Sequence, residues 1–422
     1  MKICIIGLGY IGLPTAAMFA ASGHSVVGFD VNKKVVEALN QGKILIEEPH
    51  LEEEVRKAVK KGTLRASYTP EEADAFIICV PTPINPDKTA DMSFVESGIH
   101  TVVPYLRKGN IAILESTSPP GTTRDMMCPI LEEAGFKPGE DILVAYCPER
   151  VLPGRILIEL KQNNRVIGGI NKKSAETVRE LYKSFVEGDI YISDATTAEM
   201  CKLMENTYRD VNIALANELA KLCERIGVNA WKVIEFANKH PRVNLHMPGP
   251  GVGGHCIAVD PWFIVQKQPE TAKIINLARR TNDGMPAYVL DKIKSLTGDV
   301  QGTRKICILG VTYKPNVDDM RESPIIELVH LLKEQDGYEP VVVDGHVNFE
   351  GSQDKDVYEA VKGAHLLVLA VNHKEFGDLD FARIRNSMKL PQVLDTRNFW
   401  DVDTIERAGL SYHLLGWGRN KQ

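Results

Sequence analysis

The chain opens with KICIIGLGYIG at residues 2–12, where an apolar run leads directly into a Gly-x-Gly-x-x-Gly loop made by Gly7, Gly9 and Gly12. The apolar run predicts a buried β-strand, and the residues after the loop predict a helix. Glycines between a strand and a helix let the backbone approach a pyrophosphate at the helix N-terminus, where unpaired N–H groups favour anions. The stretch therefore indicates a Rossmann-type dinucleotide site.

The cofactor is predicted from the next apolar run, SVVGFD, which ends in Asp30. Asp30 lies 18 residues after Gly12, about where an acid binds the ribose hydroxyls of a dinucleotide. A carboxylate there would repel a 2′-phosphate, so NAD is favoured over NADP. The alternative is a structural glycine turn followed by an ordinary strand-end aspartate. The strand before the loop and the helix after it favour the cofactor site.

The opening strand has an internal echo. Residues 2–10 read KICIIGLGY and residues 305–313 read KICILGVTY, with six of nine positions identical. Two buried strands could share this composition without further likeness, but each copy begins its own series of alternating strands and helices. Thr312 stands where the first copy has Gly9, so the second copy is not expected to hold a pyrophosphate in the same way.

Short β runs alternate with helical stretches over about the first 195 residues and again from residue 304, which predicts parallel sheets covered by helices. Between them, apolar residues at three- and four-residue spacing predict a long amphipathic helix from Thr196 to Lys239. We therefore expect an α/β protein with two Rossmann-like domains joined by a long-helix central segment. The expected boundaries are 1–195, 196–300 and 301–422.

Composition narrows the class of protein. The 422 residues are 44% hydrophobic and 25% charged, with a net charge of −6, which gives no electrostatic footprint for nucleic acid. The N-terminus lacks the basic segment and cleavage site of a signal peptide, and no apolar stretch approaches the roughly 20 residues that span a bilayer. We expect a cytoplasmic protein that does not enter membranes. The eight cysteines form no Cys-x-x-Cys pair or zinc-type cluster, so no metal is predicted.

One cysteine stands apart from the others. Cys256 directly follows a glycine-rich loop, GPGVGGH at residues 249–255, and Asp260 lies four residues further on. Glycines permit close approach of the backbone to a bulky polar group, and a thiol beside a carboxylate is a candidate nucleophile with a nearby base. The alternative is a buried cysteine at a helix start, which is the commoner fate of cysteine. The spacing by itself leaves both interpretations open.

Further polar residues are candidates of lesser weight. Lys202 and Asn206 lie four residues apart on the predicted long helix, and Arg209 extends the same polar stripe, which in isolation is better explained as a solvated face. Glu149 follows a strand and could orient water, although alone it is only a surface carboxylate. Thr82 and Thr117 follow strands at the sheet edge where ligands bind, but threonine there is often a turn residue.

Taken in order, the segments GLGYIG, VPTP, EST, CPERVLPG, AEMCKLMENTYRDVNIALANELA, GPGVGGHCIAVDP and KPNVDDMRESP resemble the UDP-glucose/GDP-mannose dehydrogenase family across essentially the whole chain. The resemblance implies an NAD domain, a central dimerisation segment and a C-terminal UDP-sugar-binding domain. It also implies a homodimer or higher homo-oligomer. Longer matches, CPERVLPGRILIEL and HPRVNLHMPGPGVGGHCIAVDPWF, imply UDP-N-acetyl-D-mannosamine as the substrate and a place in polysaccharide biosynthesis.

The same resemblance assigns roles to residues. It implies Cys256 as nucleophile, Lys202 and Asn206 as oxyanion-stabilising and water-positioning groups, and Asp260 as base. Glu149 is implied as a residue that orients water, and Thr117 as a residue on the cofactor side of the site. The implied cofactor contacts are Gly7, Gly9, Tyr10, Ile11, Gly12, Asp30, Thr82, Thr117 and Arg321. The implied substrate contacts are Glu149, Arg150, Val151, Lys202, Asn206, Arg209, Arg242, His246, Gly253, Lys314 and Arg397, of which Arg242 is expected to reach across a dimer interface.

The implied reaction is a four-electron oxidation of a primary alcohol to a carboxylate through a thiohemiacetal and a thioester on Cys256, with two NAD consumed. The nearest alternatives are the same chemistry on UDP-N-acetylglucosamine or UDP-glucose. Another is a two-electron dehydrogenase of a small hydroxy acid, and a further one is a non-catalytic NAD or nucleotide-sugar sensor. A sensor has no need of a nucleophile, which argues against that last alternative.

Overall fold

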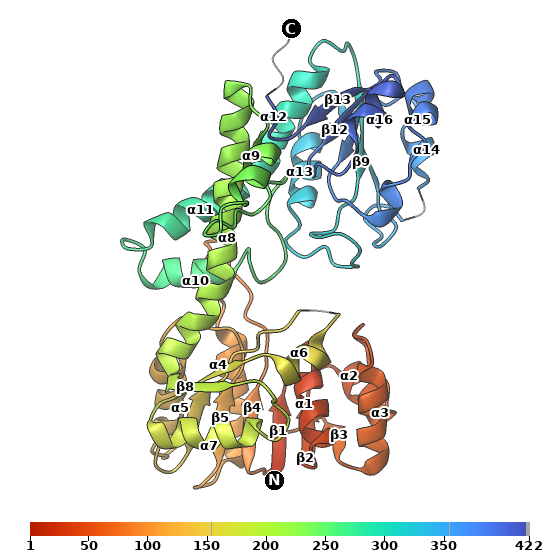
Figure 1. Ribbon diagram of the computed structural model, residues 1–422. Coiled ribbons are helices and arrows are strands. Elements are labelled where there is room, and N and C mark those ends of the chain that lie inside the picture. The colour runs from red at the N-terminus through yellow and green to blue at the C-terminus, as the bar shows by residue number, and fades with distance from the viewer. Residues whose placement is uncertain (153, 354, 419–422) are drawn as a thin grey trace. The chain divides into compact units, whose positions relative to one another are not determined.

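The computed structural model describes every residue except 153, 354 and 419–422 (Figure 1). The chain forms two compact units. The first comprises Met1–Glu205 with Trp262–Pro269, and the second comprises Asn206–Pro261 with the chain from Glu270 onward.

The first unit is built on an eight-stranded sheet of order β3-β2-β1-β4-β5-β6-β7-β8. Its strands are β1 (Lys2–Ile6), β2 (Ser25–Phe29), β3 (Leu64–Ser67), β4 (Ala75–Ile78), β5 (Ile111–Leu114), β6 (Leu143–Tyr146), β7 (Arg165–Gly169) and β8 (Ile190–Asp194). The first six follow the order of dinucleotide-binding sheets, with the switch point between β1 and β4. The prediction of a Rossmann-like sheet is confirmed, with the difference that β7 and β8 are parallel to each other but antiparallel to the first six strands.

Helices cover both faces of this sheet, as the alternation of side chains along β1 requires. Ile3 and Ile5 contribute to one buried apolar cluster, whereas Cys4 and Ile6 contribute to the other. The first cluster packs α1 (Gly12–Ala21), α2 (Lys33–Asn40), α3 (Leu51–Lys61), α6 (Ile156–Gln162) and α7 (Lys172–Tyr182). The second packs α4 (Ser93–Val102), α5 (Cys128–Glu133) and the start of α8 (Ala195–Ile226).

The second unit repeats this plan with five parallel strands in the order β10-β9-β11-β12-β13, so its switch point lies between β9 and β11. The strands are β9 (Arg304–Leu309), β10 (Tyr338–Val343), β11 (Leu366–Leu369), β12 (Gln392–Asp395) and β13 (Ser411–Leu414). Figure 1 shows α12 (Met285–Thr297) and α13 (Pro324–Lys333) on one face, and α14 (Val357–Ala360), α15 (Phe381–Ser387) and α16 (Val402–Arg407) on the other. The second Rossmann-like domain predicted from the internal echo is thereby confirmed.

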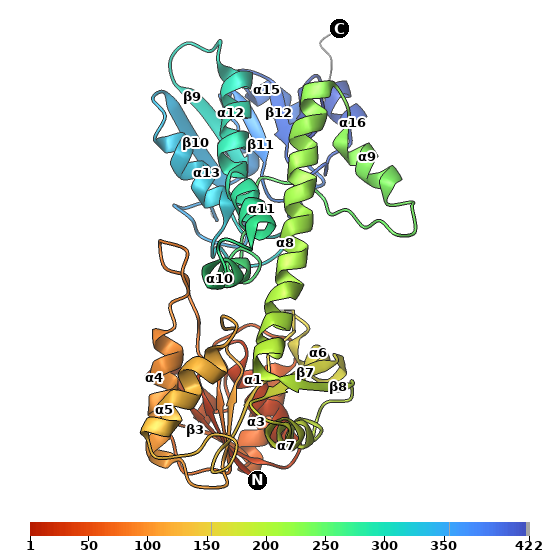
Figure 2. The same cartoon turned by 90° about the vertical axis from the view of Figure 1, so that its left-hand side faces the viewer.

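The long central helix is shorter than the sequence pattern predicted. Helix α8 runs unbroken over 32 residues and ends at Ile226 (Figure 2), not at Lys239. Gly227 adopts a left-handed conformation with φ of 78°, and the amide of Val228 donates to the carbonyl of Cys223, a common helix-ending arrangement. Asn229 then caps a separate helix, α9 (Ala230–Ala237).

Two further helices complete the central part of the chain, α10 (Asp260–Lys267) and α11 (Lys273–Asp283). Among the helices of the described residues, none combines the length and apolar character needed to cross a bilayer.

Candidate active site

The glycine loop after β1 has the geometry of a dinucleotide cradle. A Cβ on Gly7 would lie 2.6 Å from the carbonyl oxygen of Cys79, and a Cβ on Gly12 would lie 1.9 Å from the carbonyl oxygen of Gly7. Both glycines are therefore demanded by the packing of the fold itself. Gly9 is exposed, and a Cβ there would meet no protein atom within 4 Å. The open space at Gly9, beside the N-terminus of α1, fits a bound pyrophosphate.

Asp30 lies at the end of β2 beside this loop. Its Oδ2 accepts from the amide of Leu8 at 2.8 Å, and its Oδ1 accepts from the amide of Asn32 at 2.8 Å. The carboxylate is thus fixed next to the cradle while remaining half-exposed. This placement suits ribose binding and is unfavourable for a 2′-phosphate, as expected for NAD.

The structure also brings Thr82 and Thr117 to this edge of the sheet. Strands β4 and β5 are neighbours, with Ile78 opposite Leu114, so the loops that follow them start side by side. The hydroxyl of Ser116 donates to the carbonyl of Val80 at 2.7 Å and joins the two loops. Both threonines are half-buried at the carboxyl ends of the strands, where ligands of such sheets bind.

Glu149 is a buried group and not the surface carboxylate that its sequence context suggested. Its side chain is 7% exposed, and its Oε2 accepts from Nη2 of Arg165 at 2.8 Å. Arg165 is itself only 3% exposed, and its guanidinium lies over the ring of Tyr182, 5.0 Å from the centroid. The amide of Arg150 donates to the other carboxylate oxygen at 2.7 Å. A buried charge needs such compensation, so Arg165 determines where Glu149 points.

A second buried carboxyl, Glu115, belongs to the same cluster. It accepts from the hydroxyl of Tyr182, from the thiol of Cys79 at 3.1 Å and from the hydroxyl of Thr15 at 3.4 Å. Burial, reinforced by the nearby charge of Glu149, raises the pKa of Glu115 to about 7, although Arg165 and these hydrogen bonds oppose the shift.

Neither Glu115 nor Arg165 was predicted as a site residue. Glu115 directly follows the apolar strand β5, and Arg165 is the first residue of β7, so a charged residue inside or directly after an apolar strand was the available signal.

The neighbouring residues Arg150 and Val151, predicted to contact substrate, have protein partners. The guanidinium of Arg150 pairs with Glu205 at 2.6 Å and donates to the carbonyl of Asn164 at 2.9 Å. Val151 is half-buried and packs against the apolar cluster beneath α1. Their backbone and side chains fix the segment that carries Glu149.

In the second unit, Cys256, Asp260 and Asn206 come together. The amide of Asp260 donates to the carbonyl of Cys256 at 2.8 Å, so the two residues are separated by one helical turn, as their spacing allowed. Cys256 is exposed, whereas Asp260 is 3% exposed. The side-chain amide of Asn206 donates to Oδ2 of Asp260 at 2.6 Å. The carboxylate of Asp260, held by the side-chain amide of Asn206, therefore belongs to a residue one helical turn along the chain from the exposed Cys256.

The glycines before Cys256 serve packing within the chain. A Cβ on Gly251 would lie 2.6 Å from the ring of Pro324, and a Cβ on Gly253 would lie 2.4 Å from the carbonyl oxygen of Glu322. Gly254 has a φ of 81°, and its Cβ would meet the ring of Tyr313 at 2.9 Å. The bulky groups next to these glycines in the structure belong to the chain itself, and the contact of Gly253 with substrate stays a prediction. The amide of Gly254 also donates to the carbonyl of Arg321 at 3.0 Å, so the cysteine loop and the segment 313–324 form one packed structure.

The polar stripe predicted on α8 is not uniformly solvated. Lys202 is half-buried in the first unit, one helical turn before Asn206. Arg209 is exposed, but the adjacent Asp210 is fully buried and paired with the buried guanidinium of Arg279. Burial raises the pKa of Asp210, against the lowering effect of Arg279.

Two predicted substrate residues lie in the loop before the cysteine. Arg242 is exposed, and its backbone amide donates to Nδ1 of His240 at 3.3 Å. His246 is half-buried and contacts Tyr208 edge to face, with 6.3 Å between ring centroids. Burial lowers the pKa of His246, and the charge of Arg209 adds to that effect.

The remaining predicted basic residues lie around the cysteine loop in the second unit. Arg321 pairs with Asp319 at 2.7 Å, and Lys314 is half-buried in the loop after β9. Arg397 donates from Nε to the carbonyl of Ala370 at 3.0 Å, and a Cβ on Gly249 would lie 2.6 Å from its Nη1. Burial lowers the pKa of Arg397 to about 10, so the group remains a cation at neutral pH.

Comparison with known proteins gives consistent matches along the chain. Profiles of the UDP-glucose/GDP-mannose dehydrogenase family match residues 1–186 as the NAD binding domain, 196–284 as the central domain and 307–402 as the UDP binding domain. They confirm the resemblance seen in the sequence and the prediction of an NAD-binding domain.

Individual relatives match over nearly their full length. The chain is 48% identical to the UDP-N-acetyl-D-mannosamine dehydrogenase of Methanocaldococcus jannaschii, over 99% of this chain and 97% of that protein. It is 46% identical to the NDP-N-acetyl-D-galactosaminuronic acid dehydrogenase of Ralstonia nicotianae, over 96% of this chain and 97% of that protein. The UDP-D-ManNAc dehydrogenase of Pyrococcus horikoshii has a similar structure, with a TM-score of 0.93 at 40% identity over 100% of both chains.

Proposed function

The chain belongs to the UDP-glucose/GDP-mannose dehydrogenase family, and we propose that it oxidises C6 of UDP-N-acetyl-D-mannosamine from the alcohol to the carboxylate in two NAD-dependent steps. The observation that carries the proposal is the exposed thiol of Cys256 one helical turn from Asp260, whose carboxylate Asn206 holds. A two-electron alcohol dehydrogenase has no need of such a thiol, whereas a four-electron enzyme must retain its aldehyde.

NAD, when bound to the cradle of Gly9 and Asp30, supplies the acceptor for the hydride that leaves C6 in each oxidation. In the first step Asp260 takes the hydroxyl proton as that hydride departs. The thiol of Cys256 then adds to the aldehyde, and its proton goes to the new oxyanion to give a thiohemiacetal. Loss of a second hydride and of the hydroxyl proton leaves a thioester on Cys256.

Water completes the reaction by attacking the thioester, which releases the carboxylate and returns the proton to the cysteine thiolate. Glu149, fixed by Arg165, orients this water. Lys202 and Asn206 stabilise the oxyanions of both carbonyl stages, because a cation and an amide donor are the groups that favour developing negative charge.

The sugar is assigned from what similar proteins act on. A relative of almost equal identity is named for N-acetyl-D-galactosaminuronic acid, so the acetamido group is the shared feature. Initial rates with UDP-N-acetylmannosamine, UDP-N-acetylgalactosamine, UDP-N-acetylglucosamine and UDP-glucose test the assignment. We expect kcat/KM to be highest for the first. A preference for another of the four would replace the substrate and keep the chemistry.

Self-association is supported by a stripe of exposed apolar side chains along α8. Six members share the stripe: Met200, Met204, Tyr208, Leu215, Leu222 and Ile226. At 3.6 residues per turn they fall within about 80° of the helix circumference. Exposed apolar side chains gathered on one face of a long helix favour a partner surface, and a second copy of the chain provides it, giving a homodimer or a higher homo-oligomer.

We propose three domains: an NAD-binding domain at residues 1–195, a central helical dimerisation domain at 196–300 and a UDP-sugar-binding domain at 301–422. Arg321 is proposed to contact the cofactor, and Lys314, Arg397, Arg242 and His246 the substrate. The eight cysteines are all thiols, which supports a reducing cytoplasmic location, where a nucleotide-sugar acid would serve polysaccharide biosynthesis.

A further inference from the structure

The two units share a backbone arrangement at their switch points that extends well beyond the echoed strand. The amide of Gly310 donates to the carbonyl of Val343 at 2.8 Å, just as Gly7 donates to Phe29 at 2.8 Å. Oδ2 of Asp344 accepts from the amide of Val311 at 2.7 Å, just as Oδ2 of Asp30 accepts from Leu8. Asp344 is therefore the counterpart of the carboxylate that is proposed to bind the cofactor ribose.

The units differ at the next strand. Ile78, the last residue of β4, pairs with Ile6, which precedes Gly7. Leu369, the last residue of β11, pairs in the same way with Leu309, which precedes Gly310. Counting four residues onward from Ile78 reaches Thr82, and from Leu369 it reaches His373. The position of a predicted cofactor contact in the first unit is thus taken by a histidine in the second.

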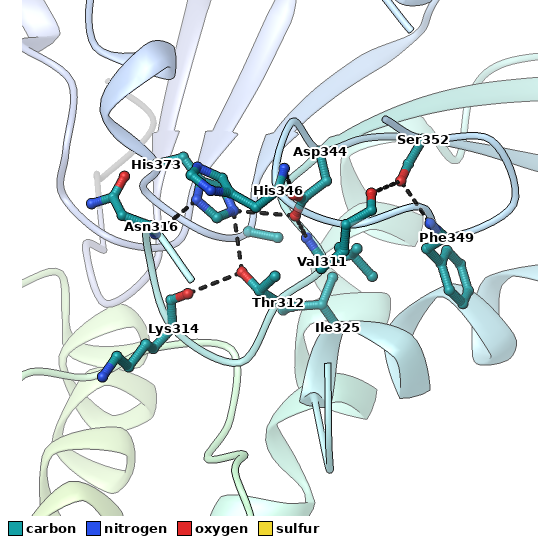
Figure 3. A network of polar contacts seen from close by, with 12 residues as sticks. Val311, Thr312, Lys314, Asn316, Ile325, Asp344, His346, Phe349, Ser352 and His373 are labelled. Atoms are coloured by element: carbon teal, nitrogen blue, oxygen red, sulfur yellow. Dashed lines mark hydrogen bonds and ion pairs between the residues drawn. The ribbon is translucent and has the colours of Figure 1, made fainter. Parts of the chain in front are cut away.

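His373 is fully buried, and both ring nitrogens have partners (Figure 3). Nδ1 accepts from the amide of Asn316 at 2.9 Å. Nε2 lies 3.1 Å from Oδ2 of Asp344 and 3.2 Å from Oγ1 of Thr312. Because Nδ1 receives a hydrogen bond, the proton of the neutral ring is on Nε2, which donates to these two oxygens.

The hydrogen bond from His373 holds the carboxylate of Asp344 in the protein interior. Asp344 is fully buried. Burial tends to raise its pKa, but the hydrogen bonds from His373 and from the amides of Val311 and His346 outweigh burial and hold the pKa below its usual range. The ring of His346 stacks on His373 with centroids 4.4 Å apart. The carboxylate of Asp344 consequently makes its hydrogen bonds to groups of the protein.

A metal ion is a weaker explanation of the same cluster. His346, His373 and Glu375 each place one potential ligand atom within 4.8 Å of the others. Coordination by His373 would require one ring nitrogen to abandon either Asn316 or Asp344. The hydrogen bonds already satisfy a buried ring, so they account for His373 without an ion.

The hydrogen bonds of His373 converge on a short loop that carries Lys314. At one end, the hydroxyl of Thr312 donates to the carbonyl of Lys314 at 2.9 Å. At the other, Asn316 adopts a left-handed conformation with φ of 59°, and its Oδ1 accepts from the amide of Lys374 at 3.0 Å. A non-glycine residue in that conformation needs support from its surroundings, and His373 supplies it through the amide of Asn316.

We propose that His373 is a positioning residue for the nucleotide-diphosphate site of the second unit. It holds residues 312–316 so that Lys314 meets a phosphate of the UDP group. Its hydrogen bond to Asp344 also keeps that carboxylate buried in a contact within the protein, whereas Asp30 of the first unit is half-exposed. The inference rests on the proposed function for the identity of the ligand, but the ordering of the loop by His373 is independent of that ligand.

Two conservative variants distinguish the hydrogen bond of Nδ1 with Asn316 from that of Nε2 with Asp344. His373→Asn keeps an acceptor near Nδ1 for the amide of Asn316, whereas His373→Gln keeps a donor near Nε2 for Asp344. In the full-length protein, titration calorimetry with UDP is expected to give His373→Ala and His373→Gln a Kd about tenfold or more above the wild type, the effect of losing one buried hydrogen bond. His373→Asn should lie closer to the wild type, and the Kd for NAD should be unchanged in all three.

The action through Lys314 is tested by a double-mutant cycle. The variant Lys314→Ala/His373→Ala should bind UDP no more weakly than Lys314→Ala alone, because the loop then has no cation to position. Additive losses, or an unchanged UDP affinity in folded His373→Ala, overturn the proposal, as do equal affinities of the Asn and Gln variants.

Amide hydrogen exchange gives a readout that needs no ligand. The amide of Asn316 should be protected in the wild type and in His373→Asn, and should exchange faster in His373→Ala and His373→Gln. Failure of the wild type to bind UDP would reject the proposed function, whereas uniform protection of Asn316 in all variants would reject the positioning role.

Discussion

The side-chain amide of Asn206 donates to Oδ2 of Asp260 at 2.6 Å, and Asp260 in turn is fixed to Cys256 by the backbone of one helical turn. Asn206 therefore has a structural connection to the nucleophile in addition to its proposed role toward oxyanions. An amide so placed keeps the carboxylate oriented as an acceptor, which is what a base needs in order to receive the alcohol proton.

Replacing this amide tests its importance. Asn206→Ala should lower kcat by about 10²–10³, the usual loss for a preorganised oxyanion donor, with little change in the KM for NAD. Steady-state rates at saturating sugar and NAD measure it. Asn212→Ala is the matched control, because Asn212 lies on the same helix and its side-chain amide donates to the carbonyl of Tyr208 at 2.8 Å. Equal rates in the two variants would remove Asn206 from the mechanism.

The buried pair of Arg165 and Glu149 predicts a large stability effect. Arg165→Met leaves a buried carboxylate without its cation, which should reduce the free energy of unfolding by about 3–5 kcal/mol. The control is Arg107→Met, which breaks the exposed pair with Glu72 and should cost at most about 1 kcal/mol. Urea unfolding followed by circular dichroism compares them. Similar losses in both variants would mean that the buried pair contributes no more than a surface one.

Glu115 predicts a definite dependence of stability on pH. Its folded pKa of about 7 lies above the ordinary value of 4.5, so the folded state binds the proton more tightly than the unfolded state. The stabilisation from this group is complete below pH 4.5 and is lost as pH rises through 7. The difference in Tm between the wild type and Glu115→Gln should therefore fall as the pH rises from 4.5 through 7. Glu140→Gln, at an exposed position, should track the wild type, and a flat difference for Glu115→Gln would contradict the shift.

The apolar stripe on α8 predicts how the oligomer is disrupted. Leu215→Glu with Leu222→Glu places two charges in the proposed contact and should lower the molar mass measured by light scattering to that of one chain. Leu45→Glu changes an equally exposed leucine elsewhere and should leave the mass unchanged. A wild type that is already monomeric at micromolar concentration would contradict self-association through this stripe.

Much of the architecture could be predicted because it is local in sequence. The alternation of apolar runs and helical stretches defines both sheets, and the four-residue spacing of Cys256 and Asp260 anticipates their shared turn. The end of α8 was also readable from Gly227 and the capping residue Asn229, but the apolar periodicity that continues into α9 obscured it.

Contacts between distant segments could not be predicted in this way. Asn206 and Asp260 are 54 positions apart, and Glu149 meets Arg165 only because the segment after β6 returns beside β7. The glycines before Cys256 gave a signal of close approach, but nothing in the sequence identified Tyr313 and Pro324 as what approaches them. Composition likewise could not show that Asp210, within a polar stripe, is buried against Arg279.

The central claim is that Cys256 carries the sugar through a second oxidation. Its most direct test is the number of NADH formed per UDP-N-acetylmannosamine supplied in limiting amount, measured by absorbance for the wild type and for Cys256→Ser. We expect two NADH per sugar for the wild type and at most one, formed slowly, for Cys256→Ser. One NADH per sugar in the wild type, or two in Cys256→Ser, would contradict it.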